Sequence, residues 1–389
     1  MIYLDAAATT PVRRDVLEAM WPYLTGEFGN PSSHHQLGET AAQALAAARA
    51  SVAKVFGCRA GDITFTSGGT EAANLAVKGI ALARQAANPT HHRILISALE
   101  HPAVLESARY LAHRHGFVVD VLGVDPDGMV TPAALAAAIR PETALVSVMY
   151  ANNEVGTIQP IRELSAVARK NHIPFHTDAV QAAAYLPLNL KDLGVDALTF
   201  SGHKLGAPKG SGVLVASGRL AMEPTVHGGG QERGRRSGTE NVAGAVGLAA
   251  ALSRTRGEAP QQATEVAALR DAFIRAVTAA VPNAVLTGHP SQRLPTLASF
   301  CFPGTSGEAV LLELERTGVI CSSGSACAAG SDEPSAVLLA LGLDPAVAQT
   351  AVRFSFTAAI SSAELTTAAQ AVGAAVARVR GTGTAVRPG

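Results

Sequence analysis

A lysine that closes an apolar run is the residue best placed for covalent chemistry. Lys204 ends the segment TFSGHK over residues 199–204, and the run ALTF over 197–200 predicts a strand that carries the lysine into the protein. A buried lysine with a lowered pKa is a nucleophilic amine, the group that forms a Schiff base with an aldehyde. Taken alone, Lys204 is at least as consistent with an ordinary solvated surface lysine.

A carboxylate closes a second apolar run. Asp178 ends the segment IPFHTD over residues 173–178, and by itself it is equally consistent with an N-capping residue. Together with Lys204 it meets two needs of a pyridoxal 5'-phosphate site. The amine binds the aldehyde carbon, and the carboxylate keeps the ring nitrogen protonated, so that the ring draws electrons from the substrate. The pair therefore predicts one cofactor site.

Apolar runs alternate with helix-like segments along the first half of the chain. The runs lie at 63–66, 93–97, 117–122, 144–149, 173–177, 196–200 and 212–216. The helical segments between most of them lie at 70–84, 102–115, 132–140 and 161–171. This alternation predicts an α/β fold with a mainly parallel sheet covered on both faces. Ligands of such sheets bind at the carboxyl ends of the strands, where Asp178, Ser201 and Lys204 all fall.

Further elements flank this region. Thr10 as a cap and the proline after it predict a helix that runs to about Gly26, and a second, Ala-rich helix is predicted over 36–56. A shift to Arg, Glu, Gln and Pro over residues 251–262 suggests a domain boundary. The elements predicted beyond it form a smaller α+β domain: helices at 263–281 and 361–379, and strands near 296–302 and 351–356.

We therefore expect three parts. An N-terminal segment, 1–14, is associated with the small domain, a large cofactor-binding domain covers 15–255, and the small C-terminal domain covers 256–389. The 31 Lys and Arg residues balance the 31 Asp and Glu residues, so no nucleic-acid or anionic-membrane partner is indicated. Signal-peptide, membrane-spanning, disulfide and zinc patterns are not seen, and we expect a cytoplasmic protein without a bound metal.

A glycine-rich helix start predicts a phosphate site. The segment SGGTE over residues 67–71 follows the run ITFT and opens a helix. Glycines let the backbone approach a ligand closely, and free N–H groups at a helix start bind phosphate. A turn that only redirects the chain is the alternative for this motif alone. Beside Lys204 and Asp178, a phosphate cup at Gly69 and Thr70 is favoured.

Polar side chains follow other strand ends. His101 comes after the run RILIS and is suited to stack on a planar ring and to move protons. Asn153 and Gln181 follow two further runs, and their amides are suited to hold a phenolic oxygen or a substrate carboxylate. Each of the three, taken alone, is also explained by packing or capping.

The C-terminal part contains a cysteine and an arginine in unusual settings. Cys327 lies in SSGSACAAGS over residues 322–331, too rich in Gly, Ser and Ala for a core element, so we expect an exposed loop with a reactive thiol. The other cysteines, Cys58, Cys301 and Cys321, are predicted to be structural. Arg353 lies inside an apolar strand, where its fork suits a substrate carboxylate; an internal ion pair is the alternative.

Taken together, these motifs resemble the cysteine desulfurases of the NifS and IscS kind, in class V of the aminotransferase superfamily. The resemblance covers nearly the whole chain through YLDAAATTP, GNPSSHHQLG, SGGTEAANLAVKG, EHPAV, NNEVGTIQP, FHTDAVQ, SGHKLGAPKGSG, HGGGQERGRRSGTEN, SSGSAC and VRFSF. It implies the aspartate-aminotransferase fold, fold type I, and a homodimer with its active sites at the interface. The residues after Cys327 and the short C-terminus depart from the family's commonest form, which leaves the sulfur acceptor open.

The resemblance also implies residue roles. Lys204 would form the Schiff base and Cys327 would accept sulfur, while His101 would stack on the ring and Asn153 and Arg353 would fix the substrate carboxylate. The remaining cofactor contacts would come from Asp178 at the ring nitrogen, Gln181 at the phenolic oxygen, and Gly69, Thr70, Ser201, His203 and Thr239 of the partner subunit at the phosphate.

The implied activity is sulfur removal from L-cysteine, giving L-alanine and a persulfide on Cys327. The sulfur would pass to an acceptor protein for iron–sulfur cluster or other thio-cofactor synthesis. Two enzyme alternatives stay open, a selenocysteine lyase and another class V pyridoxal-phosphate aminotransferase. A non-catalytic sulfur-transfer or interaction protein that has kept the fold is the third, and it predicts a colourless protein.

Overall fold

The computed structural model describes residues 1–323 and 333–383. A seven-stranded sheet lies at the centre of the larger lobe, in the order β2-β8-β7-β6-β5-β3-β4. The strands β3 to β7 run parallel, and β8 runs antiparallel to both of its neighbours. Their bounds are β2 (Ile63–Thr66), β3 (Arg93–Ser97), β4 (Val118–Leu122), β5 (Thr143–Ser147), β6 (Phe175–Asp178), β7 (Ala197–Ser201) and β8 (Gly212–Ala216). The predicted mainly parallel sheet is confirmed.

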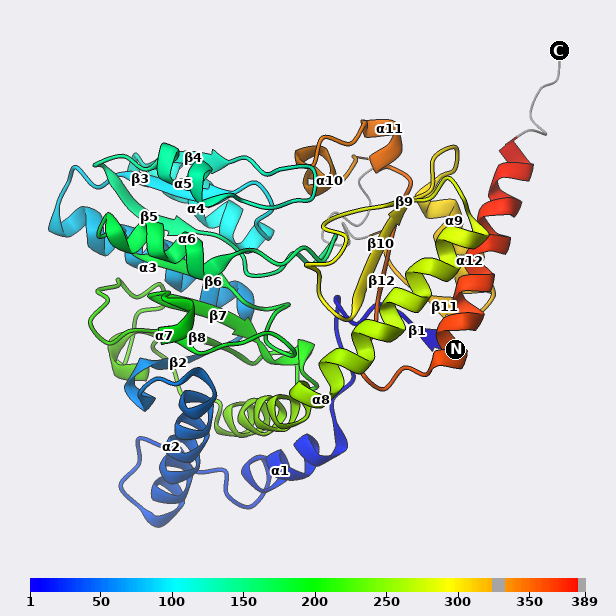
Figure 1. Cartoon of the computed structure of the whole chain (residues 1–389). Coiled ribbons are helices and arrows are strands. Elements are labelled where there is room, and N and C mark those ends of the chain that lie inside the picture. The colour runs from blue at the N-terminus through cyan, green and yellow to red at the C-terminus, as the bar shows by residue number, and fades with distance from the viewer. Residues whose placement is uncertain (324–332, 384–389) are drawn as a thin grey trace.

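Helices cover both faces of this sheet (Figure 1). Along β3, Ile94 and Ile96 pack against α3 (Gly69–Ala87) and α4 (Pro102–His115), whereas Leu95 joins the cluster on the opposite face. That opposite cluster includes α5 (Pro132–Ala138) and α6 (Ile161–Lys170). Successive side chains of a strand point to opposite faces, so a strand covered on both sides must be apolar throughout. This explains why the central strands are continuous apolar runs.

The smaller lobe combines two short sheets. One is antiparallel, in the order β12-β10-β9, and the other is the parallel pair β1-β11. An Asp5–Ser355 bridge joins the N-terminal segment to β12, and the lobe has its own core of Phe and Val side chains. The strands are β1 (Ile2–Tyr3), β9 (Val285–Leu286), β10 (Leu297–Cys301), β11 (Val319–Ile320) and β12 (Ala351–Ser355). The helices are α9 (Gly307–Arg316), α10 (Ala336–Ala340), α11 (Pro345–Ala348) and α12 (Ser362–Gly383).

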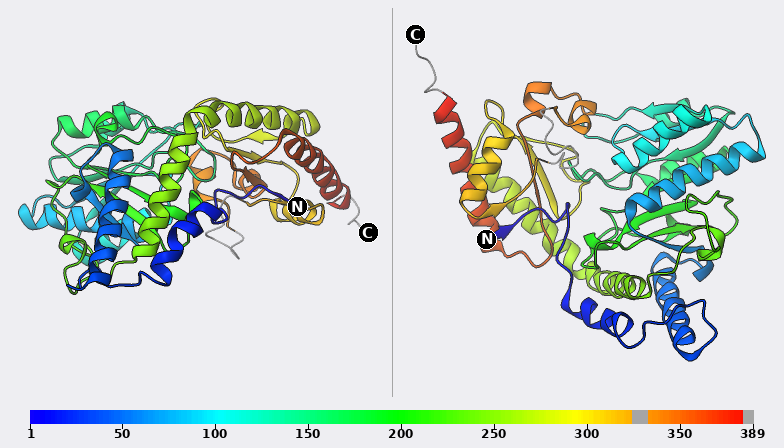
Figure 2. Two further views of the ribbon diagram at one scale, coloured as in Figure 1. Left: turned by 90° about the horizontal axis from the view of Figure 1, so that it is seen from below. Right: turned by 180° about the vertical axis from the view of Figure 1, so that it is seen from behind.

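One helix, α8 (Val242–Ala280), joins the two lobes. The composition shift at 251–262, which suggested a domain boundary, lies within α8. Arg, Glu and Gln are good helix formers, and Arg254 and Glu258, one turn apart, form an ion pair of 2.6 Å. Figures 1 and 2 show that α8 bends between the lobes.

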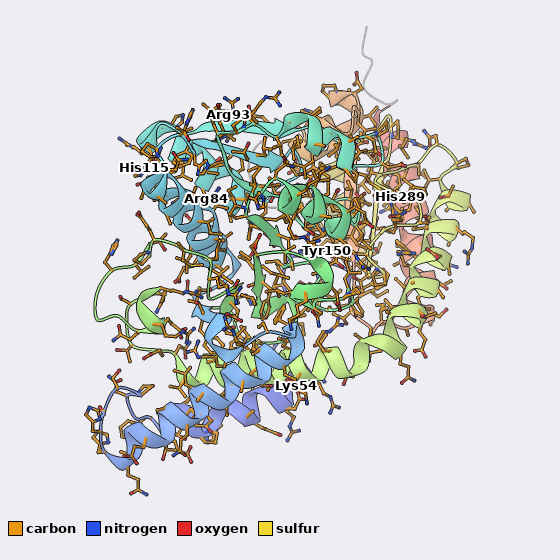
Figure 3. The ribbon with its side chains drawn as sticks, turned by 60° about the vertical axis from the view of Figure 1, so that its left-hand side comes forward. Lys54, Arg84, Arg93, His115, Tyr150 and His289 are labelled. Carbon is orange, nitrogen blue, oxygen red and sulfur yellow. The ribbon has the colours of Figure 1, made fainter. Side chains whose placement is uncertain are left out.

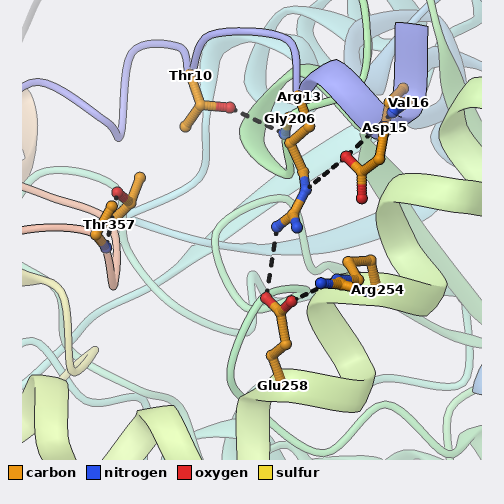
Figure 4. A network of polar contacts seen from close by, with 9 residues as sticks. Thr10, Arg13, Asp15, Val16, Gly206, Arg254, Glu258 and Thr357 are labelled. Atoms are coloured by element: carbon orange, nitrogen blue, oxygen red, sulfur yellow. Dashed lines mark hydrogen bonds and ion pairs between the residues drawn. The ribbon is translucent and has the colours of Figure 1, made fainter. Parts of the chain in front are cut away.

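The N-terminal helices show one further difference from expectation. The first, α1 (Arg14–Leu24), begins after Thr10 rather than at it. The Thr10 hydroxyl instead donates to the His203 carbonyl at 2.8 Å. It also accepts from the Gly206 N–H at 3.0 Å (Figure 4). The second, α2 (Gln36–Phe56), has the predicted bounds, and Gly57 ends it with φ at 60°. The short helix α7 (Leu190–Leu193) and the 3-10 turns at Ala60–Asp62, Gly202–Lys204 and Glu232–Gly234 complete the elements.

The two edges of the sheet differ in their side chains. Arg93 starts β3, and Arg84 and His115 lie near the ends of α3 and α4, at the amino edge (Figure 3). Tyr150 follows β5 at the opposite, carboxyl edge and lies apart from these three. Within the described ranges, no helix combines the length and apolarity that crossing a bilayer requires.

Candidate active site

Several predicted residues meet at the carboxyl edge of the sheet. Asp178 is the last residue of β6, and Ser201 is the last residue of β7. A 3-10 turn directly after β7 ends at Lys204. His101 follows β3 and caps α4, with its Nδ1 accepting from the Ala103 N–H at 3.1 Å. Because β3, β6 and β7 run parallel in one sheet, their ends bring the four side chains to one edge.

The Asp178 carboxylate is the buried charge of this edge. It is 5% exposed, and its Oδ1 accepts from the Val180 N–H at 2.9 Å. Burial raises the pKa of Asp178, and the nearby His101 and Lys204 oppose that rise. Both side chains are therefore within electrostatic range of the carboxylate, as a shared site requires.

The N-terminal turn holds the Lys204 side chain. The half-buried Nζ donates to the carbonyl oxygens of Ala7 and Ala8, both at 2.5 Å. Gln181 reaches the same turn, because its Nε2 donates to the Ala7 carbonyl at 3.1 Å. Lys204, Gln181 and Val180 line a cleft of about 570 Å³ between the lobes. The sequence analysis did not predict this turn, although Ala7 and Ala8 lie in YLDAAATTP, one of the motifs that carry the family resemblance.

The start of α3 and the end of β7 lie against each other. A Cβ on Gly69 would come within 2.9 Å of Val180 Cγ2 and 3.3 Å of Ser201 Cβ, so glycine is required there. Gly68 caps the helix, with no side chain of residues 1–323 or 333–383 bonded to the cap, and Thr70 in the first turn is exposed. The open N–H groups of this turn form an anion-binding end.

His203 and Thr239 lie on different sides of this region. The Nδ1 of His203 is 3.1 Å from Thr9 Oγ1. Burial, and then the charges of Lys204 and Lys209, lower the pKa of His203 to about 4, so it is neutral at neutral pH. Thr239 is exposed and lines a pocket of about 190 Å³ with Ser67, just before α3. A role for Thr239 across a subunit interface stays a prediction.

Arg353 has an internal partner. It is 2% exposed in β12, and its Nη2 donates to Asp5 Oδ1 at 2.6 Å. Its Nη1 donates to the backbone carbonyl of Asn153 at 2.9 Å. The ion pair that was the alternative for Arg353 is thus present. Asn153 contacts it through the main-chain carbonyl, and a role of the Asn153 side-chain amide at a substrate carboxylate stays a prediction.

The described cysteines differ in how deeply they are buried. Cys301 is fully buried in β10, which confirms its place in a strand core. Burial raises the pKa of Cys58 and Cys301 to about 11 and that of Cys321 to about 12, so all three stay thiols at neutral pH. Cys327 lies outside the described residues. On either side of it in the chain, Ser322 pairs with the Arg353 backbone and Ser335 donates to Glu154 Oε2 at 2.5 Å.

A second buried carboxyl group lies beside Asp178. Glu100 is 7% exposed, and its Oε1 accepts from the Met149 N–H at 2.7 Å. Its Oε2 is buried and has no hydrogen-bond partner among the described residues. Burial and then the charge of Asp178 raise the pKa of Glu100 well above 4.5, which favours the neutral carboxyl group. The sequence analysis did not single out Glu100, although its position beside His101, just after a predicted strand, was a signal.

Replacing Glu100 with glutamine should stabilise the protein progressively as pH rises. Above pH 4.5 the unfolded chain releases the Glu100 proton while the folded chain keeps it, so the wild type loses stability until its folded pKa is reached. Glutamine does not titrate. Thermal unfolding at pH 5 and pH 8 should therefore give a Tm difference, variant minus wild type, that is larger at pH 8.

The exposed Glu106, paired with Arg109 on α4, provides the control. The Tm difference of Glu106→Gln should be the same at both values of pH. A wild-type protein that gains stability over Glu100→Gln between pH 5 and pH 8 would show instead that the buried carboxyl group is ionised and paired.

Relatives of known name match almost the whole chain. The family described as "Aminotransferase class-V" matches residues 2–367. The chain is 44% identical over 353 residues to "Cysteine desulfurase IscS" of Dictyoglomus turgidum, covering 91% of this chain and 89% of the relative. It is 42% identical over 380 residues to "Cysteine desulfurase NifS" of Azotobacter vinelandii, covering 97% of this chain and 93% of the relative.

Solved structures agree with these matches. A "NIFS-LIKE PROTEIN" has a TM-score of 0.90 at 34% identity and covers 97% of this chain and 99% of its own. "SspA in complex with cysteine" has a TM-score of 0.79 at 34% identity and covers 92% and 99%. The α/β fold of the pyridoxal-phosphate-dependent type is therefore confirmed. The chain belongs to the class V aminotransferase family, in the branch of the IscS- and NifS-like cysteine desulfurases.

Proposed function

We propose that this chain is a pyridoxal 5'-phosphate-dependent cysteine desulfurase that converts L-cysteine to L-alanine and leaves the sulfur as a persulfide on Cys327. The convergence of Lys204, Asp178 and His101 at the carboxyl edge of the sheet carries the proposal. Family membership supports it, because relatives that share 42% and 44% of their residues with this chain bear the name cysteine desulfurase.

The residues present suit this cofactor, on which the class V family depends. The buried Asp178 suits a ring nitrogen that must stay protonated, and the half-buried Lys204 amine suits the aldehyde. The start of α3, where Gly69 leaves no room for a side chain, and the neutral His203 suit a phosphate. When bound, the cofactor supplies an electron sink for negative charge at the substrate α-carbon.

Arg353 and its neighbours suit an amino-acid carboxylate. A guanidinium binds a carboxylate through two parallel hydrogen bonds, which also orient the substrate. Arg353 extends from a fully buried strand and is held by Asn153 and Asp5, so its direction is set by the fold. The related SspA was solved in complex with cysteine. We infer that L-cysteine binds here by its α-carboxylate.

Two side chains handle protons and one accepts sulfur. Lys204 takes the α-proton and returns it, and His101 serves as a second proton carrier; such steps contribute about 10²–10⁴-fold each. The Cys327 thiolate attacks the substrate sulfur, so that an S–S bond forms as the C–S bond breaks. The carbon that loses sulfur gains a proton, which yields L-alanine.

The sulfur then leaves the enzyme. A persulfide can be passed to another thiol, so we propose an acceptor protein that serves iron–sulfur cluster or other thio-cofactor synthesis. We further propose a cytoplasmic homodimer, in which Thr239 of the partner subunit completes the phosphate site.

The absorption spectrum and product analysis of the purified protein test this function. We expect a visible band from the lysine-bound cofactor. With L-cysteine and dithiothreitol, we expect L-alanine and sulfide in equal amounts without a 2-oxo acid. A colourless protein would favour the non-catalytic alternative, and alanine formed only from selenocysteine would favour a lyase. Amino transfer that requires a 2-oxo acid would favour a transaminase.

A further inference from the structure

The carboxylate of Asp5 lies against the guanidinium proposed to bind the substrate. Asp5 Oδ1 and Arg353 Nη2 are 2.6 Å apart, the geometry of a charge-assisted hydrogen bond. The arginine side chain is 2% exposed and the aspartate side chain is 19% exposed. A guanidinium this deeply buried is costly without a counter-ion, so Asp5 stabilises the position of Arg353.

The backbone around Asp5 is anchored to the same strand that carries Arg353. Asp5 bridges Ser355, the Ala6 N–H donates to the Ser355 carbonyl at 2.9 Å, and the Ala7 N–H donates to Ser355 Oγ at 2.8 Å. The Tyr3 hydroxyl donates to the Asp5 carbonyl at 3.0 Å. The carboxylate therefore has a defined position relative to the guanidinium before any ligand arrives.

The same turn also fixes the amine of the site. The carbonyls of Ala7 and Ala8, two and three residues after Asp5, accept from Lys204 Nζ. The group that would bind the substrate carboxylate and the group that would take its α-proton are thus aligned by one short segment. A change in the direction of the guanidinium would shift the substrate relative to Lys204.

The negative charge of Asp5 also affects how strongly Arg353 attracts a carboxylate. The pair of Asp5 and Arg353 has no net charge, so an incoming carboxylate meets a donor whose positive charge is already balanced. Electrostatic attraction to the carboxylate is therefore weaker than that of an unpaired guanidinium, while directed hydrogen bonding remains. The product keeps the same carboxylate, so a weaker electrostatic attraction favours its release. Binding energy that substrate, transition state and product share equally gives no gain in kcat.

We propose that Asp5 is a positioning residue for the proposed reaction, which aligns Arg353 and moderates its affinity for the α-carboxylate of substrate and product. The inference rests on the proposed function of the site. It differs from a merely structural ion pair, which would affect stability alone.

Two substitutions separate alignment from charge. Asp5→Asn removes the charge and keeps an oxygen acceptor for Arg353 Nη2, whereas Asp5→Ala removes both. We expect Asp5→Asn to bind L-alanine about tenfold more tightly than the wild type, because the guanidinium charge is no longer balanced. Asp5→Ala should bind L-alanine about tenfold more weakly than Asp5→Asn, because the two variants differ only in alignment.

The measurement is isothermal titration calorimetry of the purified holoenzyme with L-alanine, together with KM and kcat for L-cysteine and Tm for each variant. KM should change in the same direction as the L-alanine dissociation constant. The control is Asp15→Asn, since Asp15 also pairs with an arginine, Arg13, but on the surface at 3.2 Å. This variant should match the wild type.

Two outcomes would overturn the proposal. One is Asp5→Asn binding L-alanine within twofold of the wild type, and the other is Asp5→Ala binding as tightly as Asp5→Asn. A lower Tm in both variants with unchanged binding would identify a structural ion pair only. If Asp5→Ala cannot be purified, Asp5→Asn against the wild type still decides the effect of charge. Failure of the wild type to release alanine from L-cysteine would count against the proposed function, separately from these comparisons.

Discussion

Replacing Lys204 with alanine should abolish the conversion of L-cysteine to L-alanine. The variant loses the amine that would bind the cofactor and the base that would take the α-proton. Loss of general acid–base catalysis alone costs about 10²–10⁴-fold in rate, and loss of covalent binding adds to this. The measurement is alanine formation together with the visible absorption band, which should also disappear.

The position of Lys204 makes this test specific. Its Nζ contacts two carbonyl oxygens of the N-terminal turn and lies near Asp178, so its position is set by the fold. Lys170, exposed at the end of α6, is the control, and Lys170→Ala should keep both the band and the activity. A Lys204→Ala variant that keeps the band and more than a tenth of the activity would contradict the proposed site.

Replacing Cys327 with alanine should stop sulfide release while leaving the cofactor band intact. Without this thiol there is no nucleophile for the substrate sulfur, and we expect a loss on the order of 10³-fold or more. The residues before and after the segment that contains Cys327 support this prediction indirectly. Ser322, near the start of the segment, pairs with the backbone of Arg353, and Ser335, after it, bonds to Glu154. Both attachments are beside the proposed substrate carboxylate site.

Cys58 gives the matched control for this prediction. Its thiol is half-buried, and its pKa is raised to about 11, so it is a poor nucleophile at neutral pH. Cys58→Ala should keep full activity. Mass spectrometry of the wild type after L-cysteine treatment should show one added sulfur atom per chain on the peptide that contains Cys327. An added sulfur on another cysteine, or undiminished sulfide release by Cys327→Ala, would refute the assignment.

Local sequence patterns predicted the central sheet and its strand-end residues well. A strand covered on both faces must be apolar, so β5, β7 and β8 were visible as runs, and side chains such as Asp178 at their ends followed from the parallel arrangement. The pairing of Asp5 with Arg353 was not predictable in this way. The two residues are 348 positions apart, and only the folded chain brings them together.

Other differences from expectation also have identifiable physical causes. The segment at 251–262 suggested a domain boundary because its composition shifts to Arg, Glu, Gln and Pro, and in the structure its helix formers lie inside α8, the helix that joins the lobes. The raised pKa of Glu100 depends on burial and on Asp178, neither of which a sequence pattern records. Helix α1 begins late because Thr10 bonds to Gly206, a residue far along the chain.

The bend in α8 affects how the two halves of the molecule can move. A continuous hydrogen-bonded backbone resists torsion and stretching far more than a flexible tether, so the halves cannot drift apart as independent bodies. Any opening of the interlobe cleft should therefore bend this one helix, which makes the width of the opening a mechanical property of a single backbone element.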